Sequence, residues 1–400
     1  MTEGEFSGAV RRLLAEPGEL MSDPTADPRY TSLRARHEAL GASFTDFGGW
    51  MMPVRYTSDL AEHHAVRTAA GLFDISHMAE FIVEGDGAGA FLDYALAGRL
   101  STMPVGKAKY SLVLAASGGI VDDVIVYRLD EGWFLVISNA GNREAVATAL
   151  AERAADFAAI GQGVAAVEDA SDSFALIAVQ GPVARQIVEA TPGIEGLERA
   201  LTDVPYYAAV RGEFGGEALL IARTGYTGED GYELMIPVAA AGALWDALLD
   251  AGAPLGLVPA GLAARDTLRL EAGMPLYGHE LSLDIVPAQA GLGRVVAIDK
   301  GEFVGKAGLA SVVAADAPVL VGLVADGKRA GRAGYEVYAG DERVGEITSG
   351  ALSPTLQHPI AMAFVSPAHS APGTDLTIDV RGTRIPATVA TLPFYKRNAK

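Results

Sequence analysis

Three apolar, strand-like runs follow one another at turn-length intervals between Tyr110 and Ser138, and this spacing most constrains the fold. The runs read YSLVLAA, DVIVYRL and GWFLVIS, and they are rich in the β-branched and aromatic residues that strands prefer. Parallel strands need a long crossover between them, which these short connections do not offer. We therefore expect antiparallel hairpins, which predict an α+β fold rather than a doubly wound α/β fold.

The rest of the pattern predicts more than one domain. Helical and strand signals alternate irregularly up to about Leu309, and only short, turn-punctuated strands follow it. We expect residues 29–309 to form an α+β region and residues 310–400 to form a β-barrel or jelly roll. Residues 1–28 hold a short helix candidate broken by Pro17 and then a stretch without an apolar pattern, and they are expected to be an appended, disordered segment. The clearest helix predictions are 31–42, 59–71 and 142–157.

Charge and composition exclude several classes of protein. Lys and Arg number 31 against 50 Asp and Glu, so the net charge of −19 repels a nucleic-acid backbone. No uninterrupted apolar stretch reaches the roughly 18 residues needed to cross a bilayer. The absence of cysteine excludes disulfides, thiolate metal sites and cysteine nucleophiles, and fits a cytoplasmic location. We expect neither nucleic acid nor membrane as a partner.

Two motifs that resemble cofactor or metal sites are weak. Residues 85–90, GDGAGA, satisfy a dinucleotide fingerprint, but Asp86 lies where a pyrophosphate would bind, and a plain strand-to-helix turn explains the glycines equally well. His63 and His64 are adjacent on a predicted helix and point about 100° apart, and the chain has no H-E-x-x-H motif. We expect no nicotinamide, flavin or metal.

Residues 223–234, RTGYTGEDGYEL, are a stronger candidate for a binding site. Glycines recur every three residues around Tyr226 and Tyr232, which would let the backbone approach a flat ligand. Glu233 follows where strand alternation resumes, and a carboxylate there suits the paired N–H donors of a pterin or guanine. A glycine-rich hairpin with solvated acids explains the segment equally well, so both interpretations stay open.

Arg265 and Arg269 lie four residues apart on a helix predicted within residues 260–280. Like charges so placed repel by roughly 0.2–0.5 kcal/mol unless an anion lies near them. Asp266 and Glu271 are possible internal partners, and the carboxylate of an anionic ligand is the functional alternative. The sequence leaves these two open as well.

Taken in order, six segments resemble one family closely, the glycine cleavage T-proteins or aminomethyltransferases. The resemblance runs from about Tyr30 to Arg397. It implies a three-domain cloverleaf of two interleaved α+β domains and a C-terminal barrel or jelly roll, in agreement with a division near residue 310. The segments are FGGWMMPVRY, GLFDISHM, GKAKYSLVLAASGGIVDDVIVY, TGYTGEDGYEL, GLAARDTLRLEAGMPLYG and GEITSGALSPTL.

The resemblance also implies a reaction. The family takes the aminomethyl group carried on the lipoyl arm of H-protein and passes its methylene to tetrahydrofolate. The products are 5,10-methylenetetrahydrofolate, ammonia and dihydrolipoyl H-protein. Lipoylated H-protein and tetrahydrofolate are therefore the expected partners. The alternatives are a tetrahydrofolate-dependent demethylase or methyltransferase with another one-carbon donor, and a non-catalytic folate-binding protein, whose relatives bring a reactive cysteine that this chain lacks.

Individual residues are carried over from the family by position. Its catalytic aspartate matches Asp123, which is expected to lie near N5 and N10 of the folate. Consecutive strand residues face opposite sides, so Asp122 is expected to be a turn or surface residue. The other expected folate contacts are Tyr110 and Tyr226 as lining aromatics, Glu233 at the pterin edge, Arg265 at the glutamate carboxylate and Met78 in the pocket wall.

Overall fold

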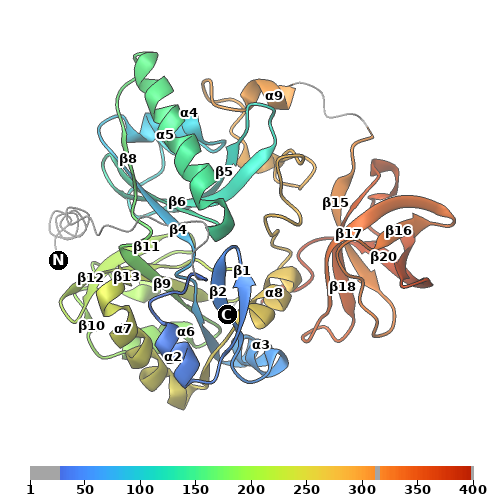
Figure 1. The fold of residues 1–400 in the computed structure, drawn as a ribbon, viewed down its shortest axis with the longest axis horizontal. Coiled ribbons are helices and arrows are strands. Elements are labelled where there is room, and N and C mark those ends of the chain that lie inside the picture. Colours follow the sequence, from blue (N-terminus) through green and yellow to red (C-terminus); the bar gives the residue numbers. More distant parts are fainter. Residues whose placement is uncertain (1–27, 311–315, 398–400) are drawn as a thin grey trace.

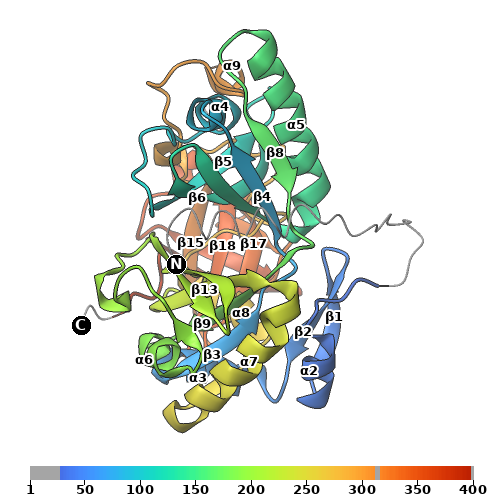
Figure 2. The same cartoon turned by 90° about the vertical axis from the view of Figure 1, so that its left-hand side faces the viewer.

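The computed structural model describes residues 28–310 and 316–397, and these form two α+β lobes and a β-barrel (Figure 1). We call the lobes the seven-stranded lobe and the five-stranded lobe after their sheets. Seen from the side, the five-stranded lobe lies above the seven-stranded lobe, and the barrel lies behind both (Figure 2). The predicted α+β class is thereby confirmed. The disorder expected of residues 1–28 concerns a segment that, apart from residue 28, lies outside the described residues.

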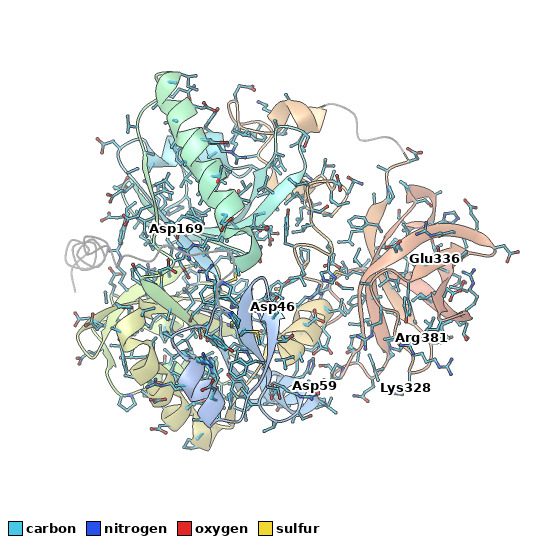
Figure 3. All side chains as sticks on the ribbon, viewed as in Figure 1. Asp46, Asp59, Asp169, Lys328, Glu336 and Arg381 are labelled. Atoms are coloured by element: carbon cyan, nitrogen blue, oxygen red, sulfur yellow. The ribbon has the colours of Figure 1, made fainter. Side chains whose placement is uncertain are left out.

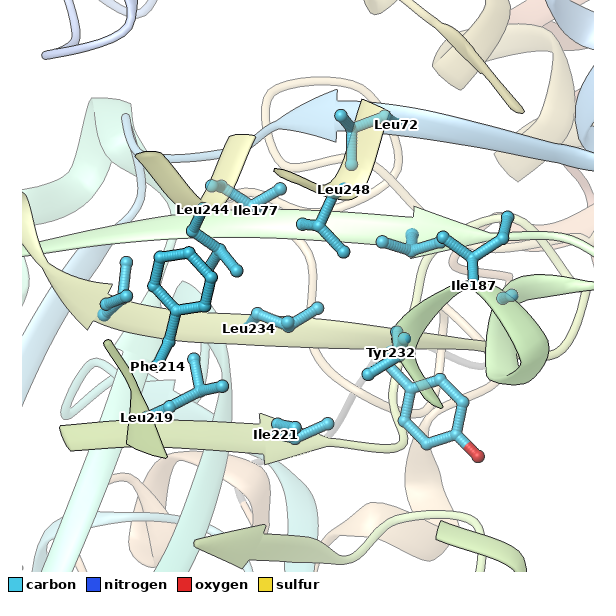
Figure 4. Close-up of a cluster of buried hydrophobic side chains, with 14 of the residues drawn as sticks. Leu72, Ile177, Ile187, Phe214, Leu219, Ile221, Tyr232, Leu234, Leu244 and Leu248 are labelled. Carbon is cyan, nitrogen blue, oxygen red and sulfur yellow. The ribbon is translucent and has the colours of Figure 1, made fainter. Parts of the chain in front are cut away.

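The seven-stranded sheet has the order β10-β11-β12-β13-β9-β3-β14 and is antiparallel except where β14 pairs with β3. Its outer face packs against α6 and α7, and Leu244 and Leu248 of α7 lie over the sheet (Figure 4). The bounds are β3 Ala70–Asp74, β9 Phe174–Gln180, β10 Ile194–Glu195, β11 Ala209–Phe214, β12 Glu217–Ala222, β13 Gly231–Pro237, β14 Leu257–Pro259, α2 Arg34–Ala39, α3 Asp59–Thr68, α6 Ala184–Ala190 and α7 Val238–Gly252.

Val238–Leu255 is the single helical stretch among the described residues that is long and apolar enough to span a membrane by length and composition. Its apolar character has a local explanation. Leu244, Trp245 and Leu248 are fully buried in the core beneath α7, so this helix is an ordinary cover for the sheet.

The five-stranded sheet is fully antiparallel, with the order β5-β6-β7-β4-β8. The predicted hairpins are β5, β6 and β7, and the helix predicted at 142–157 is α5, which packs with α4 over the outer face of the sheet. The bounds are β4 Ala79–Glu84, β5 Ala108–Leu114, β6 Ile120–Asp130, β7 Trp133–Ser138, β8 Ala166–Asp169, α4 Ala88–Ala95 and α5 Arg143–Ala159.

The two lobes are interleaved in the chain. The neighbouring strands β3 and β4 belong to different sheets, and the chain returns to the first sheet only at β9. A second core lies between the inner faces of the two sheets and contacts α8, Leu262–Glu271. Phe73, Tyr127 and Leu220 are among its buried members. Residues that point inward from either sheet therefore meet at one junction.

The C-terminal strands form a closed six-stranded antiparallel barrel, so the alternative of a jelly roll is excluded. Closure comes from β15, which pairs with both β18 and β20. Lys328, Glu336 and Arg381 lie on the barrel, away from the junction of the lobes (Figure 3). The bounds are β15 Val319–Ala325, β16 Glu336–Ala339, β17 Glu342–Leu352, β18 Pro359–Val365, β19 Asp375–Val380 and β20 Thr383–Ala390.

A separate hairpin, β1 (Ser43–Phe47) and β2 (Trp50–Arg55), runs beside the seven-stranded lobe. Its turn reaches the five-stranded lobe, since a Cβ on Gly48 would lie 3.2 Å from the backbone nitrogen of Gly141. The φ of +60° at Gly48 also requires glycine in this turn.

Candidate active site

The polar residues named from the sequence converge on the junction of the two lobes. Tyr110 and Asp123 come from β5 and β6 of the five-stranded sheet, and Glu233 comes from β13 of the seven-stranded sheet. Tyr226 lies on the loop before β13, and Arg265 lies on α8. Strand alternation accounts for Glu233, because its neighbours in sequence point into the outer core while Glu233 and Met235 face the junction.

Asp123 accepts one hydrogen bond on each carboxylate oxygen. The hydroxyl of Tyr110 donates to Oδ2 over 3.0 Å, and Nδ2 of Asn139 donates to Oδ1 over 2.7 Å. Burial raises the pKa of Asp123, and the hydrogen bonds from Tyr110 and Asn139 oppose this shift. The carboxylate is thus held in one orientation with lone pairs free for a further partner.

Asp122 is not a surface residue, so that expectation was wrong. Its exposed fraction is 0%, and Oδ2 accepts the backbone N–H of Asn139 over 3.0 Å. Its Oδ1 accepts the side-chain amides of Asn139 and Asn142 at 2.8 and 2.6 Å. The alternation argument was correct that Asp122 faces away from Asp123, but that side of the sheet is covered by the start of α5. Strand alternation shows which residues share a face of the sheet, but it does not show whether helices cover that face.

Glu233 is held by a short chain of hydroxyl groups. Thr224 Oγ1 donates to Glu233 Oε2 at 2.5 Å, and the hydroxyl of Tyr127 lies 3.0 Å from the same Thr224 oxygen. Burial raises the pKa of Glu233, while Thr224 and the charge of Arg265 lower it. A half-buried carboxylate with one oxygen engaged can still accept from a ligand.

Arg265 and Arg269 have different surroundings although they share one helix. Nη1 of Arg265 is buried and has no hydrogen-bond partner among the described residues, and the guanidinium carbon lies 4.9 Å from the ring centroid of Tyr226. Burial lowers the pKa of Arg265, against the opposing charge of Glu233. Arg269 instead pairs with Asp266 at 2.8 Å and Glu280 at 3.1 Å. Only Arg265 has donor capacity left for a ligand.

The glycines of the 223–234 segment have a structural role. A Cβ on Gly225 would lie 2.0 Å from Oε1 of Gln180, and one on Gly231 would lie 2.5 Å from Nε2 of the same side chain. Gln180 also donates to the carbonyl of Thr224 at 3.1 Å and accepts from Thr227 at 2.9 Å. These glycines therefore let the loop pack on β9. The close approach of a flat ligand to this loop stays a prediction.

Met78 and Tyr207 complete the junction. Met78 is half-buried on the turn between β3 and β4, and both side chains pack against the core between the sheets. Burial raises the pKa of Tyr207. The phenol of Tyr206 and the carboxylates of Glu233 and Asp123 raise it further. Tyr207 also has a φ of +57°, which is rare for an aromatic residue.

Sequence reasoning missed three contributors to the site: Asn139, Thr224 and Tyr207. Asn139 directly follows β7, and a polar residue at the end of a buried strand beside the Asp122–Asp123 pair was an available signal. Thr224 lies inside the 223–234 segment, in which only the glycines, the tyrosines and Glu233 indicated a site. Nothing in the local sequence marks Tyr207.

The weaker sequence motifs have packing roles. A Cβ on Gly87 would lie 2.8 Å from the carbonyl oxygen of Val164, so this turn needs glycine to pack against a neighbouring loop. His63 is fully buried and contacts Thr267 at 2.7 Å and Thr355 at 2.8 Å. In the part of the chain that the structure describes, no group of three or more His, Cys, Asp or Glu could hold a metal ion.

The chain matches two family models over most of its length. A family model described as the GCVT N-terminal domain matches residues 33–300, and one described as the glycine cleavage T-protein C-terminal barrel domain matches residues 319–396. The aminomethyltransferase of Cutibacterium acnes is 56% identical over 379 residues, covering 92% of this chain and 99% of that protein. The aminomethyltransferase of Saccharopolyspora erythraea is 54% identical over 379 residues, covering 94% and 100% respectively.

A solved structure also matches. The glycine cleavage system aminomethyltransferase T from Bartonella henselae has a TM-score of 0.84 at 35% identity, covering 92% of this chain and 99% of that one. The fold and the matches together define a transferase with two α+β lobes and a C-terminal barrel, of the aminomethyltransferase class. The chain belongs to the glycine cleavage T-protein family.

Proposed function

We propose that the chain transfers the methylene of an aminomethyl group from the lipoyl arm of H-protein to tetrahydrofolate. The products are 5,10-methylenetetrahydrofolate, ammonia and dihydrolipoyl H-protein. The observation that carries the proposal is the meeting, at one junction, of an oriented carboxylate at Asp123, a second carboxylate at Glu233 and the unpartnered guanidinium N–H of Arg265.

The residues present fit a folate at both of its ends. A buried cation with an unused donor is costly unless an anion completes it, and the glutamate carboxylate of folate would do so at Arg265. Glu233 suits the paired N–H donors at the edge of the pterin. The rings of Tyr110 and Tyr226 and the side chain of Met78 would form the walls of the pocket. No metal has a part in this proposal.

Asp123 would act on the charge that develops during transfer. Bound tetrahydrofolate supplies the two nitrogens that receive the carbon. As ammonia departs, positive charge develops on the transferred carbon, and a fixed carboxylate nearby stabilises it. Tyr110 and Asn139 hold the Asp123 carboxylate in place for this role. Burial raises the pKa of Asp123, and a raised pKa makes the carboxylate a better acceptor for a proton from the reacting nitrogen.

The test is calorimetric titration with tetrahydrofolate, with NADH as a control, followed by turnover with aminomethyl-loaded H-protein. Folate binding together with H-protein-dependent release of ammonia is the expected result. Folate binding without this turnover would indicate another one-carbon donor. Absence of folate binding would refute the proposal and assign the junction residues to the scaffold.

A further inference from the structure

Asp122 is a fully buried acid that no step of the proposed reaction uses. A carboxylate in this position must be hydrogen-bonded to be tolerated, and Asp122 accepts three donors from two residues, Asn139 and Asn142. Both asparagines lie in the turn that leads from β7 into α5. Negative charge is favourable at this end of a helix, so part of the role of Asp122 is structural.

Asn139 connects the two faces of the sheet. Its Nδ2 lies 2.8 Å from Oδ1 of Asp122 and 2.7 Å from Oδ1 of Asp123. The same nitrogen lies 3.3 Å from the backbone carbonyl of Asp123. One amide group thus donates to two carboxylates that point to opposite sides of β6. The orientation of this amide is decided on the buried side, by Asp122, because the backbone N–H of Asn139 is bound there too.

We propose that Asp122 is a positioning residue that acts through the carboxamide of Asn139. Asp122 holds the amide against Oδ1 of Asp123 and leaves Oδ2 of Asp123 to the hydroxyl of Tyr110. The inference rests on the proposed function, since it assigns a supporting group to the residue proposed to act on the transferred carbon. Asp122 itself contacts neither substrate nor reacting atoms.

The proximity of the two carboxylates has an electrostatic consequence. Burial and then the charge of Asp123 raise the pKa of Asp122 to about 7, against the donors from Asn139 and Asn142. None of the ion pairs found among the described residues involves either carboxylate. The groups that face the pair are phenols: Tyr110 from β5, Tyr226 and Tyr207 from loops of the seven-stranded lobe, and Tyr277 from the segment after α8. The charge of Asp123 therefore disfavours charge on Asp122.

The decisive variant is Asp122→Asn in the full chain. Oδ1 of the new side chain can still accept from Nδ2 of Asn139. Its NH₂ group, however, replaces Oδ2 and faces the backbone N–H of Asn139, so two donors meet and the carboxamide of Asn139 must turn. We expect kcat to fall roughly tenfold with the dissociation constant for tetrahydrofolate within about twofold of wild type. The acid limb of the kcat/KM profile should shift up by about one pH unit, because the donor from Asn139 that lowers the pKa of Asp123 is misplaced.

Two further variants keep the result interpretable. Asp93→Asn removes a carboxylate of the same lobe that accepts from Ser101 and the backbone N–H of Leu100, without contact to Asp123. It should leave the acid limb in place. Asn142→Ala removes only the third donor to Asp122 and should shift the limb in the same direction as Asp122→Asn, by less. This variant serves as the test if Asp122→Asn does not fold.

An acid limb that stays within about 0.2 pH unit in Asp122→Asn or, failing that, in Asn142→Ala would overturn the inference and leave Asp122 a structural cap. The same holds if Asp93→Asn moves the limb equally. A wild-type enzyme that releases no ammonia would refute the proposed function itself, and this is distinguishable because it precedes any comparison of variants.

Discussion

Arg265 and Arg269 lie one helical turn apart on α8 but differ in their hydrogen-bond partners. Arg269 is surrounded by the acids Asp266 and Glu280 and donates to Ser349 of the barrel, so its charge is used within the protein. Arg265 keeps a buried nitrogen without a partner. Of the two alternatives that the sequence left open, the structure gives Arg269 internal partners, while the ligand-binding role of Arg265 stays a prediction.

Arg265→Ala should weaken the binding of tetrahydrofolate by roughly 1.5–3 kcal/mol, the scale of a charge-assisted hydrogen bond. This corresponds to about a 10- to 150-fold rise in the dissociation constant, measured by calorimetry. The melting temperature should not fall, since an unpaired buried charge is removed. Arg269→Ala is the contrast: it leaves Glu280 buried without its cation and should lower the melting temperature instead. An unchanged dissociation constant in Arg265→Ala would mean that this arginine is structural.

Asp123→Asn should retain folate binding and lose turnover by at least about 100-fold, because the shape persists while the charge goes. The measurement is the rate of ammonia release at saturating folate. Asp130→Asn, at the far end of the same strand, is the matched control and should turn over normally. Near-normal turnover in Asp123→Asn would exclude a catalytic role for this carboxylate.

At the scale of elements, local sequence was a good guide. The hairpins β5–β6–β7 and the helix α5 lie where the pattern predicted them, because alternation, turn residues and helical period are properties of a few neighbouring residues. The segment 59–71, predicted as one helix, is α3 followed at Ala70 by β3. The residues Ala70–Gly71 join the strand because they pair with β14 and β9, which are more than 100 residues away.

The loop before β13 offers a test at this scale. Gly225→Ala should destabilise the protein by about 1–3 kcal/mol, because its Cβ would collide with the buried side chain of Gln180. Folate affinity should fall as well, since Tyr226 is the next residue. Gly301→Ala is the matched control, as a Cβ there meets nothing within 4 Å. Chemical denaturation of both variants measures the difference, and equal stability of the two would show that the loop can move away from Gln180.

At the scale of the whole molecule, Glu271 connects the barrel to the lobes. Its carboxylate accepts from Ser353 and Thr355, which follow β17 of the barrel, and from Arg67 of α3. His63 of α3 lies 3.3 Å away. Burial alone would raise the pKa of Glu271, but His63, Ser353 and Arg67 lower it to about 2. A carboxylate at the end of α8 thus joins elements that lie far apart in the sequence.

This network makes stability depend on pH. The pKa of Glu271 is lower in the fold than its ordinary value of 4.5, so its contribution is complete above about pH 4.5 and is lost as the pH falls towards 2. Glu271→Gln should therefore cost roughly 3 kcal/mol at pH 7 and much less at pH 3, measured by denaturant unfolding. Glu302→Gln, at an exposed position, should change neither value. An equal loss at both pH values would attribute the effect to packing rather than to ionisation.

The sequence by itself determined the α+β class and the change to an all-β C-terminal region, because alternation and turn chemistry are local. Asp123 and the other residues expected at the junction followed from the family resemblance, and Asn139, Thr224 and Tyr207 were not among them. Only the tertiary structure decided that the barrel is closed, that Asp122 is buried, that Asn139 joins two carboxylates and that Arg269 is structural. Each of these depends on contacts between distant segments, and the burial or free donor of a side chain exists only once those segments pack together.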